Sequence, residues 1–571
     1  MIYRIITLII LTTACFYCDS ADRITPLDLT AIPTINCIGV TWNVSGDANG
    51  NATGMLEYKE AGAAIWKKAL QLTRVPKREN PDVGKMKGSM KDYALLNFAK
   101  NYLAGSIIDL NPDTNYEVKV TIKDNDGGGA SKELKVKTRK IPVIPANGNI
   151  IEVKGGGDAL RKALTSAKAG DIFKVHAGKY NGDNTINASG TEEKPISVCA
   201  FGDGEVLISG GDTGENYKTY AFTVEGKNVI IQGFSMYNFM ICISSTKNAH
   251  NFSVIGCKME HFFTAMQLRG HNGYYADNSM KESFNAVGPK PTDDRNEGHG
   301  IFLKDGTFGS VICNNEASLV ADGYRMVAHD SDLINNDSVL LMDDAMETDY
   351  GGANLRLIGN RFSFTGQNGI SFQPYIGGPA LLVRNTVVIG QGKENTIKNR
   401  YESENAVLIN NTFISANPVD IPFRTYAKNN IFYCLENGGS ALKYDARNVK
   451  NKWFELDYNG YNNKGPNKVG DLQKMFKSTG QEEHGLIFSG NDLFEKPLEN
   501  YSKYDPGQWE VPKIYFTEKG RPHPDLTLKK DSPAIDAGVV IPNITEKFKG
   551  KAPDLGALEY GEPLSVVGPR K

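Results

Sequence analysis

The chain has little cysteine, and its spacing does not suit a metal cluster or a dense disulfide framework. Of eight cysteines, only Cys15 and Cys18 form a Cys-x-x-Cys pair, and both lie in the apolar N-terminal segment. Cys199, Cys242 and Cys257 sit within apolar alternation, which is typical of buried free thiols. Cysteine-based metal binding is therefore not expected.

Net charge is also almost absent, at −2 over 571 residues. A chain without a basic excess is not expected to bind nucleic acid or an anionic membrane surface. Beyond the N-terminal segment, no apolar run is long enough to span a bilayer. The 23% charged and 40% hydrophobic residues are those of an ordinary globular protein, and we expect a monomer.

Residues 1–21 have the pattern of an export signal. Arg4 supplies the positive start, and Ile5–Thr13 is an apolar core too short for a permanent membrane helix. Cleavage after Ala14 would leave Cys15 first, in a sequence that resembles a bacterial lipoprotein box. Cleavage after Ala21 is the alternative. We therefore expect a secreted, periplasmic or cell-surface protein, with a possible lipid anchor at Cys15.

Residues 24–140 are expected to form a small β-sandwich. Cys37–Trp42 alternates apolar and polar residues, as a half-buried strand does. Leu110–Tyr116 (Leu-Asn-Pro-Asp-Thr-Asn-Tyr) is similar to the tyrosine corner of fibronectin type III modules, with Trp42 at the position of their core tryptophan. The resemblance implies a spacing or binding module. A stiff linker containing proline and glycine follows at 138–149.

Residues 150–560 contain a recurring pattern of short strands. An amphipathic helix at 158–169 is expected to cap the open end of a stack. From about 171 to about 435, apolar runs end in Asn or Gly at spacings of roughly 20–25 residues. This predicts an all-β fold, a right-handed parallel β-helix of about ten coils, followed by an irregular C-terminal region. A β-propeller is the alternative, but its blades need longer antiparallel units.

The stretch Leu340–Asp349 concentrates carboxylates among apolar residues. If it is extended, side chains alternate between faces, so Asp343, Glu347 and Asp349 point outward, while Asp344 needs a kink to reach solvent. Such a cluster on a rigid sheet is unfavourable unless a cation, an arginine or a shared proton offsets the repulsion. Ordinary surface acidity is the alternative. The inward residues of the extended stretch are expected to be Leu340, Met342 and Met346.

Two short motifs give this cluster a family resemblance. Residues 321–324 (Ala-Asp-Gly-Tyr) and the motif Asp343-Asp344-x-x-Glu347 resemble the calcium-binding pattern of a group of β-helix pectate lyases. In this sequence Ala345 stands where that family has glycine, and Glu347 stands where it has aspartate. The resemblance implies a polysaccharide lyase acting by β-elimination on a uronate-containing glycan. It implies a Ca²⁺ ion held by Asp322, Asp343, Asp344 and Glu347.

The base of such a lyase is not fixed by the sequence. The catalytic lysine of the family has no clear counterpart, and the basic candidates are Arg384, Lys304 and His329. Glycoside hydrolysis is the alternative chemistry. Glu347 and Asp349 lie two residues apart on one strand, with roughly 6.6 Å between their Cα atoms. Their carboxyl groups could take the spacing of either a retaining or an inverting hydrolase, so this distance does not decide between the two mechanisms. A non-catalytic glycan-binding protein is the third possibility.

Polar, aromatic and basic residues gather around 299–402. A flat or grooved parallel sheet with such side chains suits an extended acidic or hydroxyl-rich polysaccharide. For Arg356 and Arg361, neutralisation of the acidic cluster is the alternative role. The predicted substrate-binding residues are Tyr324, Arg325, Arg356, Arg361, Gln373 and Tyr375.

Overall fold

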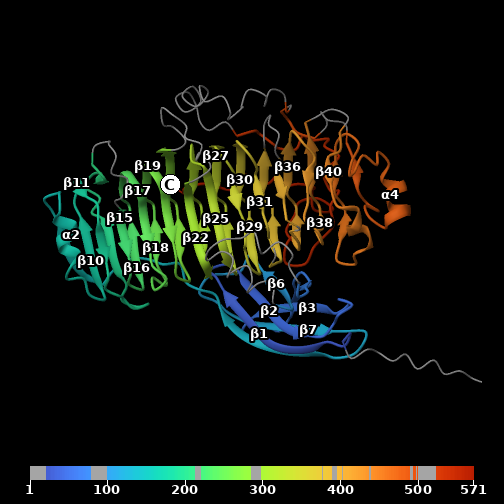
Figure 1. The fold of residues 1–571 in the computed structure, drawn as a ribbon, viewed down its shortest axis with the longest axis horizontal. Coiled ribbons are helices and arrows are strands. Elements are labelled where there is room, and N and C mark those ends of the chain that lie inside the picture. The colour runs from blue at the N-terminus through green and yellow to red at the C-terminus, as the bar shows by residue number, and fades with distance from the viewer. Residues whose placement is uncertain are drawn as a thin grey trace, which may run out of the picture.

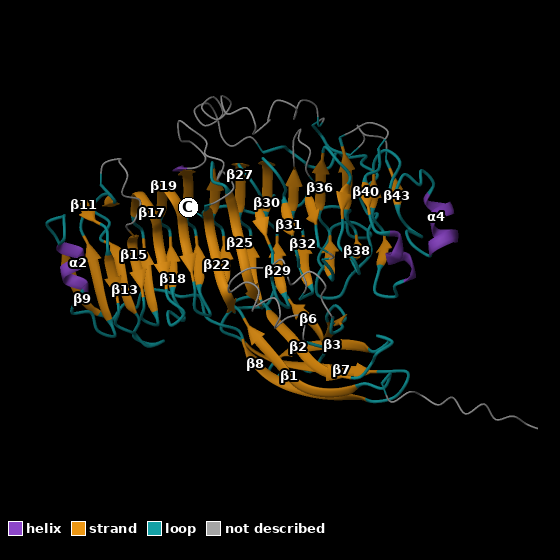
Figure 2. Cartoon of the chain, in the orientation of Figure 1, coloured by secondary structure: helices purple, strands orange, loops and turns teal. Residues whose placement is uncertain are grey.

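The structure is a computed structural model. It describes residues 21–78, 100–211, 220–284, 298–375, 377–388, 395–401, 403–435, 439–488, 493–496, 498 and 523–570. Figure 1 shows a long stack of strands with a smaller β domain packed along one side. The labelled helices α2 (Ala159–Leu164) and α4 (Leu472–Thr479) lie at opposite ends of the stack (Figure 2). The predicted all-β fold with a parallel β-helix is confirmed. The expected export signal and Cys15 lie outside the described residues.

The smaller domain consists of two antiparallel sheets. Trp42 and Val118 are fully buried between them, and the Tyr116 hydroxyl accepts the backbone N–H of Asn111 at 2.9 Å. One sheet contains β1 (Thr25–Pro33), β2 (Ile38–Ser45), β6 (Tyr102–Ile107) and β5 (Thr73–Val75). The other contains β4 (Lys67–Lys68), β3 (Thr53–Glu60), β7 (Asn115–Lys123) and β8 (Gly129–Lys137).

The solenoid has one 13-stranded parallel sheet, here called face A, so the stack is longer than the ten coils expected. Face A contains β9 (Asn149–Val153), β10 (Asp171–Val175), β13 (Ile196–Ala200), β16 (Val229–Gln232), β18 (Ser253–Ile255), β20 (Tyr274–Ala276), β23 (Val311–Cys313), β26 (Ser331–Ile334), β29 (Leu355–Ile358), β32 (Ala380–Val383), β35 (Ala406–Ile409), β38 (Tyr426–Lys428) and β41 (Glu455–Asp457).

The remaining strands of the coils form a 20-stranded sheet that bends into two faces. Face B holds β21 (Ser279–Ser283), β24 (Glu316–Ser318), β27 (Asp337–Leu341), β30 (Arg361–Thr365), β33 (Thr386–Val388), β36 (Thr412–Ser415), β39 (Ile431–Cys434), β42 (Gly460–Tyr461) and β43 (Leu486–Ile487). Face C holds β22 (His299–Phe308), β25 (Asp322–His329), β28 (Met346–Glu347), β31 (Ile370–Phe372) and β34 (Ile397–Asn399). The first coils contribute β11 (Gly178–Asn181), β12 (Asn184–Ile186), β14 (Val206–Ser209), β15 (Tyr220–Val224), β17 (Ser235–Ser245) and β19 (Lys258–Leu268).

Few other elements are present in the described part. Helix α2 is shorter than expected, but its Leu160 and Leu164 cover the end of the solenoid core as predicted for a cap. No helix in the described residues is long and apolar enough to cross a membrane. The elements of the described part outside the large sheets are α2 (Ala159–Leu164), β37 (Val419–Asp420), β40 (Leu442–Lys443), the 3₁₀ helix η2 (Ala446–Lys450) and α4 (Leu472–Thr479).

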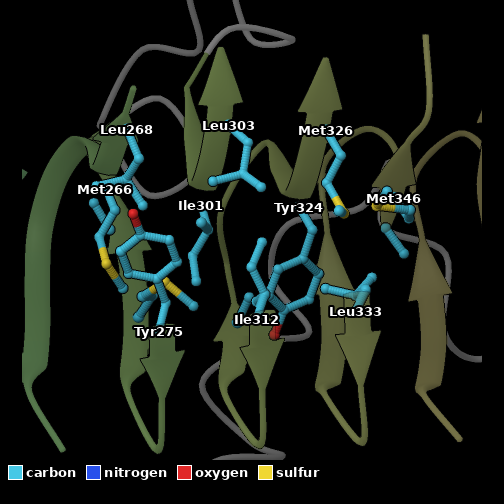
Figure 3. Packing of buried hydrophobic residues seen from close by; sticks show 14 of the residues in the cluster. Met266, Leu268, Tyr275, Ile301, Leu303, Ile312, Tyr324, Met326, Leu333 and Met346 are labelled. Carbon is cyan, nitrogen blue, oxygen red and sulfur yellow. The ribbon is translucent and has the colours of Figure 1, made fainter. Parts of the chain in front are cut away.

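Alternation within each strand builds the core. Ile301 pairs with Tyr324, Tyr324 with Met346 and Met346 with Ile370 on successive coils. All four are fully buried, and Figure 3 shows the first three pointing into the interior beside Leu333 of face A. Because the side-chain period of a strand is two, the residue after each of them faces outward.

An asparagine ladder forms the corner between faces A and B. Asn336 Nδ2 donates to Asn360 Oδ1 at 3.1 Å, and Asn360 Nδ2 donates to Asn385 Oδ1 at 2.9 Å. The residue before each rung takes a left-handed backbone, as Asn335 and Gly359 do, so Asn and Gly occupy corners as predicted. The fully buried rungs run from Asn278 through Asn315, Asn336, Asn360, Asn385, Asn411 and Asn430 to Asn459.

Replacing a middle rung is expected to destabilise the solenoid. Asn360→Ala removes the amide that bridges Asn336 and Asn385 and also bonds the Leu333 carbonyl. Each buried polar group left unsatisfied costs about 1–3 kcal/mol, so the denaturant midpoint should fall clearly. The exposed residue Asn248, replaced in the same way, should leave the midpoint almost unchanged. Equal midpoints for both variants would contradict a structural role of the ladder.

The smaller domain packs closely on face A. Asn354 Nδ2 donates to the Val40 carbonyl at 3.2 Å, and Asn543 Nδ2 donates to the Ile108 carbonyl at 2.9 Å. Gly39 faces the solenoid so closely that a Cβ there would lie 2.0 Å from Asp330 Oδ1. The contact therefore holds the two parts in one fixed arrangement.

Six cysteines of the described part, including Cys199, Cys242 and Cys257, are buried free thiols as expected.

Candidate active site

One row of outward side chains crosses five coils of face C. The strand register pairs Phe302 with Arg325, Arg325 with Glu347, Glu347 with Ser371 and Ser371 with Lys398. Neighbouring strands of a sheet lie about 4.8 Å apart, so the row brings residues from distant parts of the sequence within reach of one ligand. Glu347 Oε2 lies 2.8 Å from the Arg325 guanidinium.

Three aspartates converge beside this row. Carboxylate oxygens of Asp322, Asp343 and Asp344 lie within 4.8 Å of one another, and the three residues are at most 8% exposed. Asp344 Oδ1 accepts N–H groups from Asn368 at 2.7 and 2.9 Å, and Lys398 Nζ lies 3.4 Å from Asp344 Oδ2. Asp343 Oδ1 is buried without a hydrogen-bond partner among the described residues.

A turn between β27 and β28 places these acids. Leu340 has a φ of 57°, so the chain leaves extended geometry before Asp343 and Asp344. Leu341 enters the solenoid core, whereas Leu340 and Met342 pack in a separate apolar cluster with the C-terminal segment. The prediction that Leu340 and Met342 face the core is wrong, because the stretch is not one strand. The same turn bends the chain before Asp344, but Asp344 does not reach solvent, because it is 1% exposed.

A second group of ligating atoms adjoins the first. Ligand atoms of His299, Asp322 and Glu347 lie within 4.8 Å of one another, and Asp322 belongs to both groups. His299 Nδ1 lies 3.0 Å from Asp322 Oδ2. Asp349 belongs to neither group, and its Oδ1 accepts the Ser371 hydroxyl at 3.0 Å and the Gln373 N–H at 2.7 Å.

Burial changes the acidity of the cluster. Desolvation, reinforced by neighbouring carboxylates, raises the pKa of Asp343 to about 9 and the pKa of Glu347 to about 8. The same causes raise the pKa of Asp322 and Asp349 well above the ordinary aspartate value. Burial alone would lower the pKa of Lys398, but the surrounding carboxylates, Asp344 foremost, outweigh it and raise that pKa.

These pKa values predict that the metal-free protein loses stability as the pH rises. Between the unfolded carboxyl pKa of about 4 and the folded values of about 8–9, the native state holds protons that the unfolded chain has released. The thermal midpoint of chelator-treated protein should therefore fall from about pH 5 to about pH 8. Added Ca²⁺ should raise it most at the alkaline end. Asp343→Asn should flatten the slope, and a slope unchanged in that variant would contradict the prediction.

Two predicted substrate-binding tyrosines are core residues instead. Tyr324 and Tyr375 are 0% exposed. The Tyr324 hydroxyl donates to the carbonyls of Asn315 and Asp337, and the Tyr375 hydroxyl donates to the carbonyl of Gly352. The prediction is wrong because the parity of each strand turns these side chains inward, where the backbone satisfies their polar ends.

The predicted arginines separate into different places. Arg325 lies in the outward row, as described. Arg356 is also 0% exposed, but it pairs with Asp332 beneath the N-terminal domain, so substrate cannot reach it. Arg361 lies on face B and binds Asp337 through two nitrogens at 2.9 and 3.2 Å. The prediction that Arg356 and Arg361 neutralise the acidic cluster is therefore wrong, because the two side chains extend from other faces of the solenoid.

Two of the three candidate bases lie away from the cluster. Arg384 is at the end of β32 on face A and pairs with Asp109 of the N-terminal domain at 2.8 Å. His329 pairs with Asp330 at the far end of β25, roughly 23 Å along the strand from Asp322 at about 3.3 Å per residue. Neither can take a proton from a substrate at the cluster. Lys304 is nearer, with its Nζ 5.0 Å from the Phe302 ring centroid.

The sequence interpretation did not assign Lys398 a catalytic role. Ile397 pairs with the core residue Ile370, so alternation alone turns Lys398 outward. The residues of neighbouring coils that lie beside Lys398 were harder to predict from the sequence. The equivalent corners at Asp322, Asp344, Asn368 and Asn395 recur after 22, 24 and 27 residues. Uneven coil lengths therefore hid the row that the structure reveals.

Comparisons with known proteins give only distant similarities. No protein-family model matches the chain, and no curated protein matches it. Among solved structures, a PL6 family alginate lyase, AlyGC, shares 14% identity with a TM-score of 0.37, covering 56% of this chain and 52% of its own. The periplasmic alginate epimerase AlgG (13%, TM-score 0.27) covers 58% of this chain and 74% of its own.

A third similar structure is the catalytic unit of a GH87 α-1,3-glucanase from Streptomyces thermodiastaticus. It shares 11% identity with a TM-score of 0.26, and the match covers 68% of this chain and 91% of the glucanase. This chain spans about half the length of the alginate lyase. Similarities this distant do not assign an activity, so the function has to be argued from the site itself.

Proposed function

We propose that the protein is an exported, cation-dependent polysaccharide lyase that cleaves a uronate-containing glycan by β-elimination. The observation that carries the proposal is the meeting of the buried aspartates Asp322, Asp343 and Asp344 with the outward row that contains Arg325 and Lys398. A row with acids, a guanidinium and an amine close together offers what proton abstraction beside a carboxylate requires.

The aspartates fit a hard divalent cation. Ca²⁺ takes carboxylate oxygens, and the buried, unpartnered Asp343 Oδ1 is an oxygen still lacking a positive group. Asp322, Asp343 and Asp344 would hold the ion, with Glu347 less suited because Arg325 already pairs with it. Bound there, the ion would offset the carboxylate charge and withdraw electron density from a uronate carboxylate.

Lys398 is the base that the geometry supports. The carboxylates that raise the pKa of Lys398 would be offset by the bound cation, which favours the neutral amine. In its neutral form, the Nζ atom accepts the proton α to the uronate carboxyl, and the electron pair of that C–H bond forms the new double bond. The glycosidic C–O bond breaks, and the leaving oxygen takes a proton from water or a neighbouring acid. Arg325 lies three coils from Lys398 in the same row and would orient the substrate carboxylate.

The test is an ultraviolet assay for unsaturated uronate on a panel of acidic polysaccharides. Activity should appear with Ca²⁺, vanish with chelator and return when the ion is restored. Asp344→Asn should abolish both the activity and Ca²⁺ binding measured by calorimetry, because its carboxylate lies between Asn368 and Lys398. Arg361→Gln, on face B, is the matched control and should remain active. Product formation that ignores chelator would reject the cation requirement.

Hydrolysis is the second candidate, favoured by one observation. The pKa of Glu347, raised to about 8, would keep that carboxyl protonated as a general acid. A hydrolase also needs an ionised partner carboxylate. The pKa of Asp349 is raised as well, so the pKa values of Glu347 and Asp349 are not separated as a general acid and an ionised partner require. Chelator-insensitive release of reducing ends would favour hydrolysis, and binding without any cleavage would favour a glycan-binding protein.

A further inference from the structure

The N-terminal domain has one sheet that does not face the solenoid. Cys37 and Ile108, which adjoin β2 and β6, share an apolar cluster with Leu381 and Val407 of face A. The second sheet, of β4, β3, β7 and β8, lies on the other side of the sandwich (Figure 1). Its outward residues are therefore open to solvent.

Trp66 lies over this outer sheet at the start of β4. Its ring centroid is 5.0 Å from Lys59 Nζ of β3 and 5.8 Å from Lys119 Nζ of β7. Both ammonium groups lie within cation–π distance of the indole. Trp66 is half-buried and Ile65 beside it is 78% exposed, so the ring has an open side.

The charges around Trp66 are predominantly positive. Lys59 pairs across strands with Glu117 at 3.0 Å, and Lys137 pairs with Asp113 at 2.5 Å, yet lysines outnumber glutamates on this face. The outward lysines are Lys59, Lys68, Lys119, Lys123, Lys135 and Lys137. The outward glutamates are Glu57, Glu117 and Glu133. The sheet therefore combines a flat aromatic ring with a surplus of ammonium groups.

We propose that this outer sheet is a second glycan-binding site, which holds an acidic polysaccharide by stacking one sugar ring on Trp66 and pairing its carboxylates with Lys59, Lys119 and their neighbours. The apolar C–H face of a pyranose packs on an aromatic ring, and charge complementarity selects an acidic chain over a neutral one. The inference goes beyond the proposed reaction and takes from it only the acidic class of glycan.

The site would act as an anchor, separate from the candidate active site. The N-terminal domain is fixed to face A by buried contacts such as that of Asn354 with Val40. A polysaccharide held on the outer sheet would therefore stay at a constant position relative to face C. The expected consequence is tighter binding of long chains than of short oligomers, because two sites on one chain act together.

Affinity electrophoresis of the full chain through gels containing alginate or polygalacturonate tests the proposal. All proteins carry Lys398→Ala so that turnover cannot consume the matrix. Trp66→Ala should weaken retardation about tenfold, a loss of about 1.4 kcal/mol, and Trp66→Phe should restore most of it. The double variant Lys59→Gln with Lys119→Gln should lose retardation similarly, and added salt should weaken binding of the parent protein. Leu564→Ala, which removes an exposed side chain elsewhere, is the control.

The outcomes separate this proposal from the reaction. Equal retardation of the Trp66→Ala, double-lysine and Leu564→Ala proteins, all with unchanged thermal midpoints, would overturn it. Stronger retardation in neutral dextran than in acidic gels would also overturn it. If the protein with Lys398 intact forms no unsaturated product, but retardation still depends on Trp66, the lyase proposal fails and the second site stands.

Discussion

Replacing Lys398 by alanine is expected to lower the kcat of β-elimination by about 10²–10⁴-fold, the range typical for loss of a general base. The reason is positional. Lys398 is the outward lysine of the row on face C, and its Nζ lies 3.4 Å from Asp344 of the aspartate cluster. The initial rate of unsaturated product formation measures the effect. Ca²⁺ affinity should persist in the variant, because the aspartate oxygens remain.

Two further variants distinguish a base from a merely positive group. Lys398→Arg keeps the charge, but a guanidinium does not release its proton in proteins, so this variant should be nearly as inactive. Lys428→Ala is the matched control, because Lys428 is also half-buried, has a pKa raised by its neighbours and pairs with Glu455 at 2.6 Å. A rate within tenfold of the wild type for Lys398→Ala would refute the assignment.

Replacing Arg356 by alanine is expected to have the largest effect on stability. Arg356 and Asp332 are both 0% exposed, and Arg356 also donates to the Ser106 hydroxyl of the N-terminal domain at 3.2 Å. Removal of the guanidinium leaves Asp332 buried and uncompensated, which costs about 3–5 kcal/mol. The denaturant midpoint should fall accordingly, and limited proteolysis should cut the 138–149 linker faster as the domain detaches.

Arg384→Ala is the control for this prediction. Arg384 also joins the solenoid to the N-terminal domain, but its partner Asp109 is 44% exposed, so the loss should stay below about 1 kcal/mol. Gly39→Ala should reproduce the Arg356 result from the other side, because its Cβ would meet Asp330 and Arg356 at 2.0 and 2.8 Å. Equal midpoints for the Arg356 and Arg384 variants would show that the buried pair does not hold the interface.

Local patterns in the sequence were sufficient to predict the repeated fold. Apolar alternation with Asn or Gly at strand ends predicts stacked coils, because these requirements apply within each coil. Asn314 and Asn335 take the left-handed backbone that such corners need. The acidic stretch was also visible, because Asp343, Asp344 and Glu347 lie close together in the chain.

Which side chains meet was decided only by the stacking of coils. Lys398 and Asp344 come together because coils of unequal length fall into register, which no fixed period in the sequence specifies. Tyr324 and Arg325 are neighbours in the chain, yet strand parity buries one and presents the other. Arg356 was matched to the acidic cluster by proximity in sequence, but the solenoid turns it to face A, where the N-terminal domain covers it. The sequence by itself determined the kind of fold and its acidic segment, and tertiary register determined the site.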